Sequence, residues 1–132
     1  MPPQEVNEIT EKIIGCAYKV SNTLGIGFVE KVYENALVVL ARQSGLTVEQ
    51  QYPIKVMFEG IVVGEFFADL FVERRVLVEL KAVSMLMQEH TAQALNYLRA
   101  TEAEVCLLIN FGRSKIEIKR LLPSVYWKTP KP

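Results

Sequence analysis

Three runs of strand-forming residues follow one another in the middle of the chain, and they constrain the fold more than any other feature. The runs are rich in Val, Ile, Phe and Tyr, which favour extended backbone. Two short turns, Glu59-Gly60 and Glu73-Arg74-Arg75, separate them, so the pattern predicts three consecutive strands. The predicted strands cover residues 51–58, 62–72 and 76–83.

Helical patterns surround these strands. Apolar residues recur at helical spacing over residues 6–23 and 28–44, and a third helix is predicted over 88–100. Two further strands are predicted at 104–110, which is almost entirely apolar and therefore expected to be buried on both faces, and at 115–121. The order α-α-β-β-β-α-β-β indicates an α/β (α+β) fold with a mixed central sheet flanked by helices.

The composition is that of one ordinary globular domain. The 132 residues are 50% hydrophobic and 23% charged, with no repeat and no long linker. We therefore expect a single domain over residues 1–132, with a core of about 6–122 and a C-terminal tail at 123–132. Cys16 and Cys106 belong to no CxxC motif or Cys/His cluster, which argues against a structural zinc site or an iron–sulfur cluster.

Two features of the sequence predict a cytoplasmic protein that does not enter a membrane. The first residues, MPPQEVNE, lack the basic region and the apolar stretch of a signal peptide. No apolar run approaches the ~18 residues that a membrane-spanning helix needs.

Charge is balanced over the whole chain but uneven along it. The 15 basic and 15 acidic residues give a formal net charge of zero. Residues 1–60 carry −2, residues 61–112 carry −3 and residues 113–132 carry +5. The basic C-terminal stretch is either a solvated tail or a patch that faces phosphate groups. Arg74 and Arg75 are expected to be ordinary charges at a hairpin tip, or phosphate contacts.

An acidic residue inside a strand is the first indication of chemistry. Asp69 is the only aspartate among the 15 acidic residues, and it interrupts the apolar run EFFADLFV although aspartate is a poor strand former. In the next strand Glu79 interrupts VLVELKAV, and Lys81 follows two residues later. Because side chains alternate across a strand, Glu79 and Lys81 share one face, about 7 Å apart.

The turn between these strands decides whether the two carboxylates meet. If the turn has three residues, Val72 pairs with Val76 and Asp69 lies opposite Glu79, with Cβ atoms ~5 Å apart. Like charges this close are destabilising, so a divalent cation with oxygen ligands is expected between them, with Lys81 as a further positive charge. The alternative is a structural Glu79–Lys81 or Asp69–Lys81 ion pair on a solvated face. A turn with an even number of residues would place the carboxylates on opposite faces.

Several motifs resemble those of one nuclease superfamily. Asp69, nine intervening residues and then Glu79-Leu80-Lys81 resemble the D-x(n)-(E/D)xK core of the PD-(D/E)XK nucleases. Three further segments resemble the signature of the small bacterial GxxExxY proteins, a branch of that superfamily, and the resemblance covers about residues 9–120. The segments are Gly25-Ile-Gly27-Phe-Val-Glu30-Lys-Val-Tyr33 with Glu34 and Leu37, His90-Thr-Ala-Gln93-Ala-Leu-Asn96-Tyr97-Leu98, and Leu107-Leu-Ile-Asn110-Phe-Gly112.

The resemblance implies a restriction-endonuclease-like core, with a metal site where the second and third strands of the sheet diverge. Asp69 and Glu79 would be metal ligands, joined by the backbone carbonyl of Leu80. Lys81 would orient or help deprotonate the attacking water and would stabilise charge on the phosphate. Mg²⁺ (or Mn²⁺) suits such a set of carboxylate, carbonyl and water ligands.

The resemblance also implies supporting residues on two helices. Glu30 matches the motif glutamate and would be a further or water-mediated ligand, or else an exposed residue favoured at a helix N-terminus. Tyr33 lies on the apolar stripe and is expected in the core, with its hydroxyl near the site. His90, Gln93 and Tyr97 share one face of the third helix. Gln93 would line the active site, whereas His90 is expected to be solvated or to cap the helix rather than to act as a general base.

The resulting prediction is a Mg²⁺-dependent nuclease that hydrolyses phosphodiester bonds in DNA or RNA. Two alternatives stay open: a catalytically silent nucleic-acid-binding or protein-interaction module on the nuclease scaffold, and a small domain whose charged cluster is only structural. The neutral net charge argues against tight binding of nucleic acid by a single domain. Short α/β domains of this superfamily often pair, so a homodimer is also compatible with the resemblance.

Overall fold

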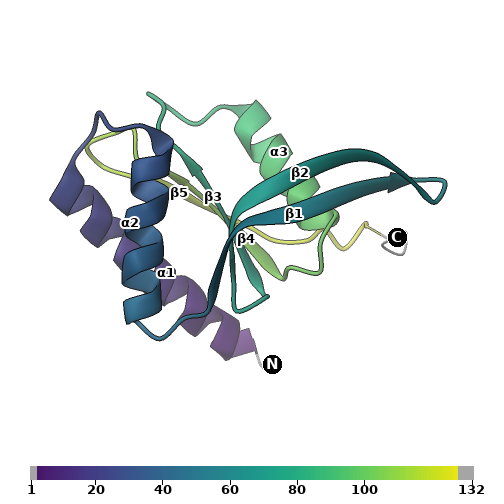
Figure 1. The fold of residues 1–132 in the computed structure, drawn as a ribbon, viewed down its shortest axis with the longest axis horizontal. Helices are drawn as coiled ribbons and strands as arrows, with labels where there is room; N and C mark the ends of the chain where they lie inside the picture. Colours follow the sequence, from purple (N-terminus) through teal and green to yellow (C-terminus); the bar gives the residue numbers. More distant parts are fainter. Residues whose placement is uncertain (1–2, 128–132) are drawn as a thin grey trace.

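The computed structural model describes residues 3–127, and these residues form helices and strands in the predicted order (Figure 1). The elements are α1 (Pro3–Leu24), α2 (Glu30–Gln43), β1 (Val48–Phe58), β2 (Ile61–Val72), β3 (Val76–Lys81), α3 (Gln88–Arg99), β4 (Val105–Asn110) and β5 (Glu117–Leu121). Lys128 and Lys131 of the predicted basic tail lie outside the described residues. No helix in the described part of the chain has the length and apolar character needed to cross a membrane.

The described strands form a single sheet in the order β1-β2-β3-β4-β5. β3 and β4 are parallel and are connected through α3, whereas all other neighbours are antiparallel. The predicted mixed sheet is therefore confirmed. The turn between β2 and β3 has three residues, with Glu73 and Arg74 in the left-handed region at φ 53° and 51°, and Val72 pairs with Val76. The predicted register of this hairpin is confirmed as well.

Helices cover both faces of the sheet: α1 and α2 lie on one side and α3 on the other (Figure 1). Side chains of β3 alternate between these layers, since Val78 and Leu80 pack in the core under α1 and α2, and Leu77 packs with Leu98 of α3. All six residues of β4 are buried, as its apolar run predicts. By the same alternation, the side chain of Glu79 lies on the α3 face.

β3 ends at Lys81, two residues earlier than predicted, because a buried side chain binds the backbone that follows it. The Val83 N–H donates to Asn110 Oδ1, and Asn110 Nδ2 donates to the Val83 carbonyl, each at 2.9 Å. The same Oδ1 accepts a hydrogen bond from the Gly112 N–H at 2.9 Å. Asn110 therefore joins the end of β3 to the turn after β4. The starts of α1 and β1 lie a few residues before the predicted ones.

The expectation for the turn arginines is wrong for Arg75. Its side chain is buried, and its Nη2 donates to Glu104 Oε1, just before β4, at 2.8 Å. Arg74 is exposed, but its Nε pairs with Glu49 Oε1 of β1 at 2.9 Å. Arg75 thus joins the β2–β3 turn to the segment leading into β4, and it is not an ordinary charge at a hairpin tip.

Candidate functional site

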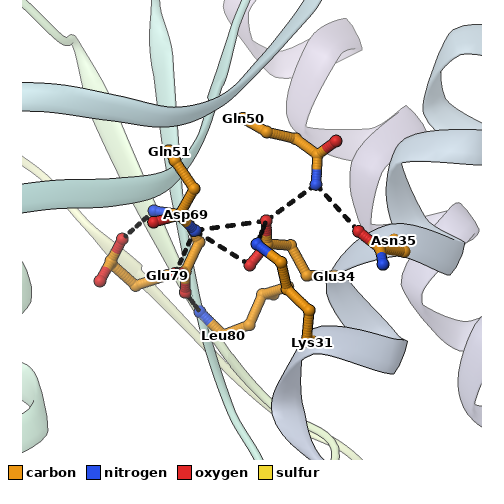
Figure 2. Close-up of polar contacts among 8 residues, drawn as sticks. All are labelled: Lys31, Glu34, Asn35, Gln50, Gln51, Asp69, Glu79 and Leu80. Carbon is orange, nitrogen blue, oxygen red and sulfur yellow. Dashed lines mark hydrogen bonds and ion pairs between the residues drawn. The ribbon is translucent and has the colours of Figure 1, made fainter.

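β2 and β3 separate at the point where the two predicted carboxylates lie (Figure 2). Backbone pairing runs from the turn only as far as Leu70 and Val78. Beyond this pair, backbone N–H groups of the two strands donate to side-chain carboxylates of the opposite strand. The Asp69 N–H donates to Glu79 Oε2, and the Leu80 N–H donates to Asp69 Oδ2, each at 2.8 Å. Asp69 and Glu79 therefore face each other across the diverging strands.

Both carboxylates are poorly solvated. Glu79 is only 4% exposed, and Asp69 is half-buried. Burial, followed by the negative charge of Asp69, raises the pKa of Glu79 to about 8, and burial also raises the pKa of Asp69. Within residues 3–127 neither carboxylate forms an ion pair, so the structural ion pair with Lys81 is absent. The two acids together carry negative charge that a bound cation would compensate.

Lys81 ends β3 on the same sheet face as Glu79 and is half-buried. Its Nζ donates to Gln93 Oε1 of α3 at 3.3 Å. The structure therefore brings Lys81 of β3 and Gln93 of α3 together, and both were predicted to belong to the site. This contact holds the ammonium group near the two acids without neutralising either of them directly.

A buried glutamate on α2 is the main feature that the sequence analysis did not place in the site (Figure 2). Glu34 is 4% exposed, and its Oε2 accepts hydrogen bonds from Gln50 Nε2 at 2.8 Å and from Lys31 Nζ at 3.0 Å. The amide of Gln51 donates to both oxygens of Glu34, at 3.1 and 3.3 Å, and contacts Asp69 Oδ1 at 3.4 Å. One side-chain amide thus bridges the α2 acid and the β2 acid.

Sequence signals for this bridge are weak. Glu34 stands four residues after Glu30 and three before Leu37, so the helical period places it on the inward edge of α2. Gln51 has no comparable signal, because its side chain is directed by a left-handed backbone (φ 52°) inside a strand. Such a conformation in a non-glycine residue depends on surrounding contacts rather than on the residue type.

A comparison with protein families identifies the scaffold. The family model of the PD-(D/E)XK nuclease superfamily matches residues 7–121. The chain belongs to the PD-(D/E)XK nuclease superfamily. Searches of curated proteins and of solved structures found no match. PD-(D/E)XK proteins are phosphodiester hydrolases that typically depend on a metal ion.

The residues present in this PD-(D/E)XK chain fit a hard divalent cation. Glu79 Oε1 accepts no hydrogen bond from residues 3–127, and Asp69 Oδ1 has only the long contact with Gln51. Each acid therefore keeps one oxygen for a ligand. The described residues contain no cluster of three or more His, Cys, Asp or Glu arranged to hold a metal. Mg²⁺ needs no such cage, since it usually binds through one or two carboxylates and retains several waters.

Two residues of the predicted site lie at the start of α2. Tyr33 is fully buried and its ring stacks on Phe111 at 4.9 Å, as expected for the core. Its hydroxyl donates to the Gly25 carbonyl at 2.6 Å and accepts from the Phe28 N–H at 3.2 Å, so it stabilises the α1–α2 loop that leads into Glu30. Glu30 is exposed, at the first residue of α2.

The charged residues of the site nevertheless shift the pKa of Glu30. Its pKa is raised, first by burial and then by the charges of Asp69 and Glu34, whereas Lys81 and His90 lower it. The structure thus places Glu30 near the cluster but shows no hydrogen bond between it and Asp69, Glu79 or Lys81 among the described residues.

On α3, His90 and Tyr97 have structural contacts. His90 Nδ1 accepts a hydrogen bond from the Met87 N–H at 2.9 Å and caps the helix, in line with the expected capping role. Tyr97 is buried, and its ring lies 5.7 Å from that of Phe66. Burial, then the charge of Glu79, raises the pKa of the Tyr97 hydroxyl. Tyr97 therefore forms part of the apolar wall beside the acids.

Proposed function

We propose that this chain is a Mg²⁺- or Mn²⁺-dependent nuclease that hydrolyses phosphodiester bonds in DNA or RNA. The observation that carries the proposal is the pair of facing carboxylates at the diverging ends of β2 and β3, with Lys81 on the same face as Glu79. Membership of the PD-(D/E)XK superfamily supports the reaction class. The substrate is a nucleic acid, and the site itself favours neither DNA nor RNA.

Asp69, Glu79 and the Leu80 carbonyl would hold the metal ion. Glu30 would serve as an additional ligand, directly or through a water, because it lies near the acids and is exposed at the rim. A bound divalent cation would activate a water for attack and would stabilise negative charge on a phosphoryl oxygen. The amide hydrogen bonds to Asp69 and Glu79 fix their orientation before any ligand arrives.

Lys81 would orient the attacking water and stabilise charge on the phosphate. The hydrogen bond to Gln93 restricts the Nζ group to the side of the site that faces α3. His90 supports this arrangement indirectly, since it caps the helix that carries Gln93. Tyr97 is buried close enough to feel the charge of Glu79, and its ring would limit the access of bulk water to that acid.

We also assign the chain to the GxxExxY branch of the superfamily. Its motif residues have distinct tasks in the structure. Gly27 has φ 111°, a conformation that L side chains rarely adopt, and Tyr33 holds the carbonyl of Gly25 across the same loop. Both residues shape the α1–α2 loop, and this loop sets where Glu30 begins α2. The motif therefore positions one acid at the rim of the site.

The test combines metal binding with cleavage. We would titrate Mg²⁺ and Mn²⁺ into wild type, Glu79→Ala and the control Glu59→Ala by calorimetry, and would follow labelled DNA and RNA with the same three proteins. Glu59 is exposed in the β1–β2 turn, far along the hairpin from the acids. The expected result is saturable binding and cleavage by wild type and Glu59→Ala, both lost in Glu79→Ala.

Two outcomes would contradict the proposal. Cleavage that persists in Glu79→Ala would exclude the acidic pair from catalysis. A salt-dependent shift of labelled nucleic acid without cleavage in either metal would instead favour a silent nucleic-acid-binding module on the same scaffold. Circular dichroism of each variant separates loss of function from loss of fold.

A further inference from the structure

The β1–β2 hairpin extends well beyond the body of the molecule. In Figure 1 its distal half projects past α3, at the opposite end of the long axis from α1. We call residues 55–67 the hairpin arm. The turn residues Glu59 and Gly60 have φ 52° and 77°, the left-handed pair of a two-residue turn that matches the twist of its strands. The arm is therefore a well-formed hairpin.

The arm exposes an unusual amount of apolar surface. The side chains of Phe58 and Ile61 are 68% and 66% exposed. Together the exposed side chains present roughly 600 Å² of apolar surface, and patches of this size on a monomer usually have a function. The exposed large hydrophobic residues of the arm are Val56, Phe58, Ile61, Val62, Val63, Phe66 and Phe67.

Both faces of the arm are apolar. Phe58 pairs with Ile61 on the face that also carries the buried Ile54, and this face continues beyond the end of α3. Met57 pairs with Val62 on the opposite face. A strand that only covers its own core is apolar on one side, so the arm has apolar surface on both sides that the described residues of this chain do not cover.

The charges of the arm are few and nearly balanced, so they permit association with a like surface. Lys55 and Glu65 are cross-strand partners, so their charges offset each other and Glu59 at the turn is the only other charge. Two such arms would repel each other weakly. β1 is also an edge strand of the sheet, but it carries Pro53 and Lys55, which protect an edge against strand pairing, so two arms are expected to meet through their faces and not through their edges. The arm has no excess of positive charge to attract a phosphate backbone or an anionic lipid surface.

We propose that the hairpin arm is the interface of a homodimer, in which the arms of two copies pack against each other about a twofold axis. A twofold axis brings the same patch of both copies together, so the apolar face of one arm would contact the same apolar face of the other. The face that carries Val56, Phe58, Ile61 and Phe66 supplies roughly 400 Å² from each copy, or about 800 Å² in total, which is the size of a weak, concentration-dependent interface. The proposal does not depend on nuclease activity.

Sedimentation velocity at protein concentrations from 1 to 100 µM, without added metal, tests this interface. Wild type should shift from monomer to dimer as the concentration rises through this range. The double variant F58K/I61E places opposite charges on cross-strand partners, which preserves the hairpin but removes the apolar contact, and it should sediment as a monomer. Val39→Lys is the control, because Val39 is 54% exposed on α2, away from the arm, and this variant should remain dimeric.

Phe66→Thr, on the same face of the arm as Phe58 and Ile61, provides a second variant if the double variant fails to fold. It should weaken the dimer at least tenfold while keeping a strand-forming residue. A wild type that is monomeric at 100 µM would overturn the proposal, and so would a folded F58K/I61E that remains dimeric. Flotation of monomeric wild type with anionic lipid vesicles would assign the arm to a membrane surface instead, and would also overturn it.

Discussion

Asp69 and Glu79 lie opposite each other where β2 and β3 diverge, and the backbone of Asp69 holds the side chain of Glu79. The Asp69 N–H donates to Glu79 Oε2 at 2.8 Å, while the Asp69 carboxylate accepts from the Leu80 N–H at the same distance. Each acid thus uses one carboxylate oxygen to bind the backbone of the neighbouring strand, and its other oxygen is left for a ligand. Because only one oxygen of each carboxylate is used in this way, the buried Glu79 and the half-buried Asp69 can stabilise the sheet and still bind a ligand.

Glu79→Gln should stabilise the metal-free protein at pH 8 and leave its stability nearly unchanged at pH 5. Because the folded-state pKa of Glu79 is raised to about 8, folding takes up a proton between about pH 5 and pH 8, and wild-type stability falls as the pH rises through this window. Glutamine keeps an oxygen for the Asp69 N–H without the charge. We expect the Tm in EDTA to rise by about 3 °C or more at pH 8.

The exposed turn variant Glu59→Gln is the control and should change the Tm little at either pH. Equal Tm changes in Glu79→Gln at pH 5 and pH 8 would show that the Tm change does not arise from burial of the Glu79 charge.

Gln51→Gly should weaken Mn²⁺ binding by about tenfold with little loss of thermal stability. Glycine accepts the left-handed φ of 52° at this position, so only the amide that bridges Glu34 and Asp69 is removed. Calorimetric titration gives the affinity. Gln50→Ala is the matched control, because Gln50 contacts Glu34 but not Asp69, and its effect should be smaller. Equal affinity in wild type and Gln51→Gly would mean that the bridge does not position Asp69.

Gly112→Ala should destabilise the fold by about 2 kcal/mol or more, measured by urea unfolding. A methyl group at this position would overlap the backbone of Val83, which is fixed by Asn110 and cannot move away easily. Gly15→Ala should have the opposite effect on stability, because no atom lies within 4 Å of its Cβ position on α1 and alanine favours a helix by about 1 kcal/mol. Similar effects of the two substitutions would contradict the close approach at Gly112.

Glu104→Gln should lower stability at pH 7, and the difference from wild type should shrink toward pH 3. The hydrogen bond from Arg75 lowers the pKa of Glu104, so the stabilisation is present above the unfolded pKa and is lost as the pH falls through the folded value. Urea unfolding at both pH values measures the two differences. Glu102→Gln, at an exposed neighbouring position, is the control. A constant difference across this pH range would exclude the Arg75 pair as its source.

Local rules explain what could be predicted from the sequence. The three-residue turn after Val72 sets the register of β2 and β3, and counting along two strands then places Asp69 opposite Glu79. Helical period and capping predicted α3 and the position of His90 at its start. These relationships involve neighbours in the chain or across one short turn, where backbone geometry alone determines the distance.

Long-range packing decided the rest. Tyr33 was expected in the core, but only the docking of α2 on the sheet decided that its ring stacks on Phe111 and its hydroxyl binds the Gly25 carbonyl. The pair of the buried Arg75 and the exposed Glu104 joins residues 29 positions apart, and no local pattern distinguishes it from two surface charges.

The amino-acid sequence by itself determined the order of the elements and, because side chains alternate along a strand, that a three-residue turn after Val72 would bring Asp69 opposite Glu79. The structure selected this turn over one with an even number of residues. Only the tertiary structure decided that Glu34 and Gln51 join these acids and that the hairpin arm extends uncovered beyond α3. Both depend on how α2 and α3 pack on the sheet. That packing is a sum of many weak apolar contacts between distant segments, which no single motif encodes.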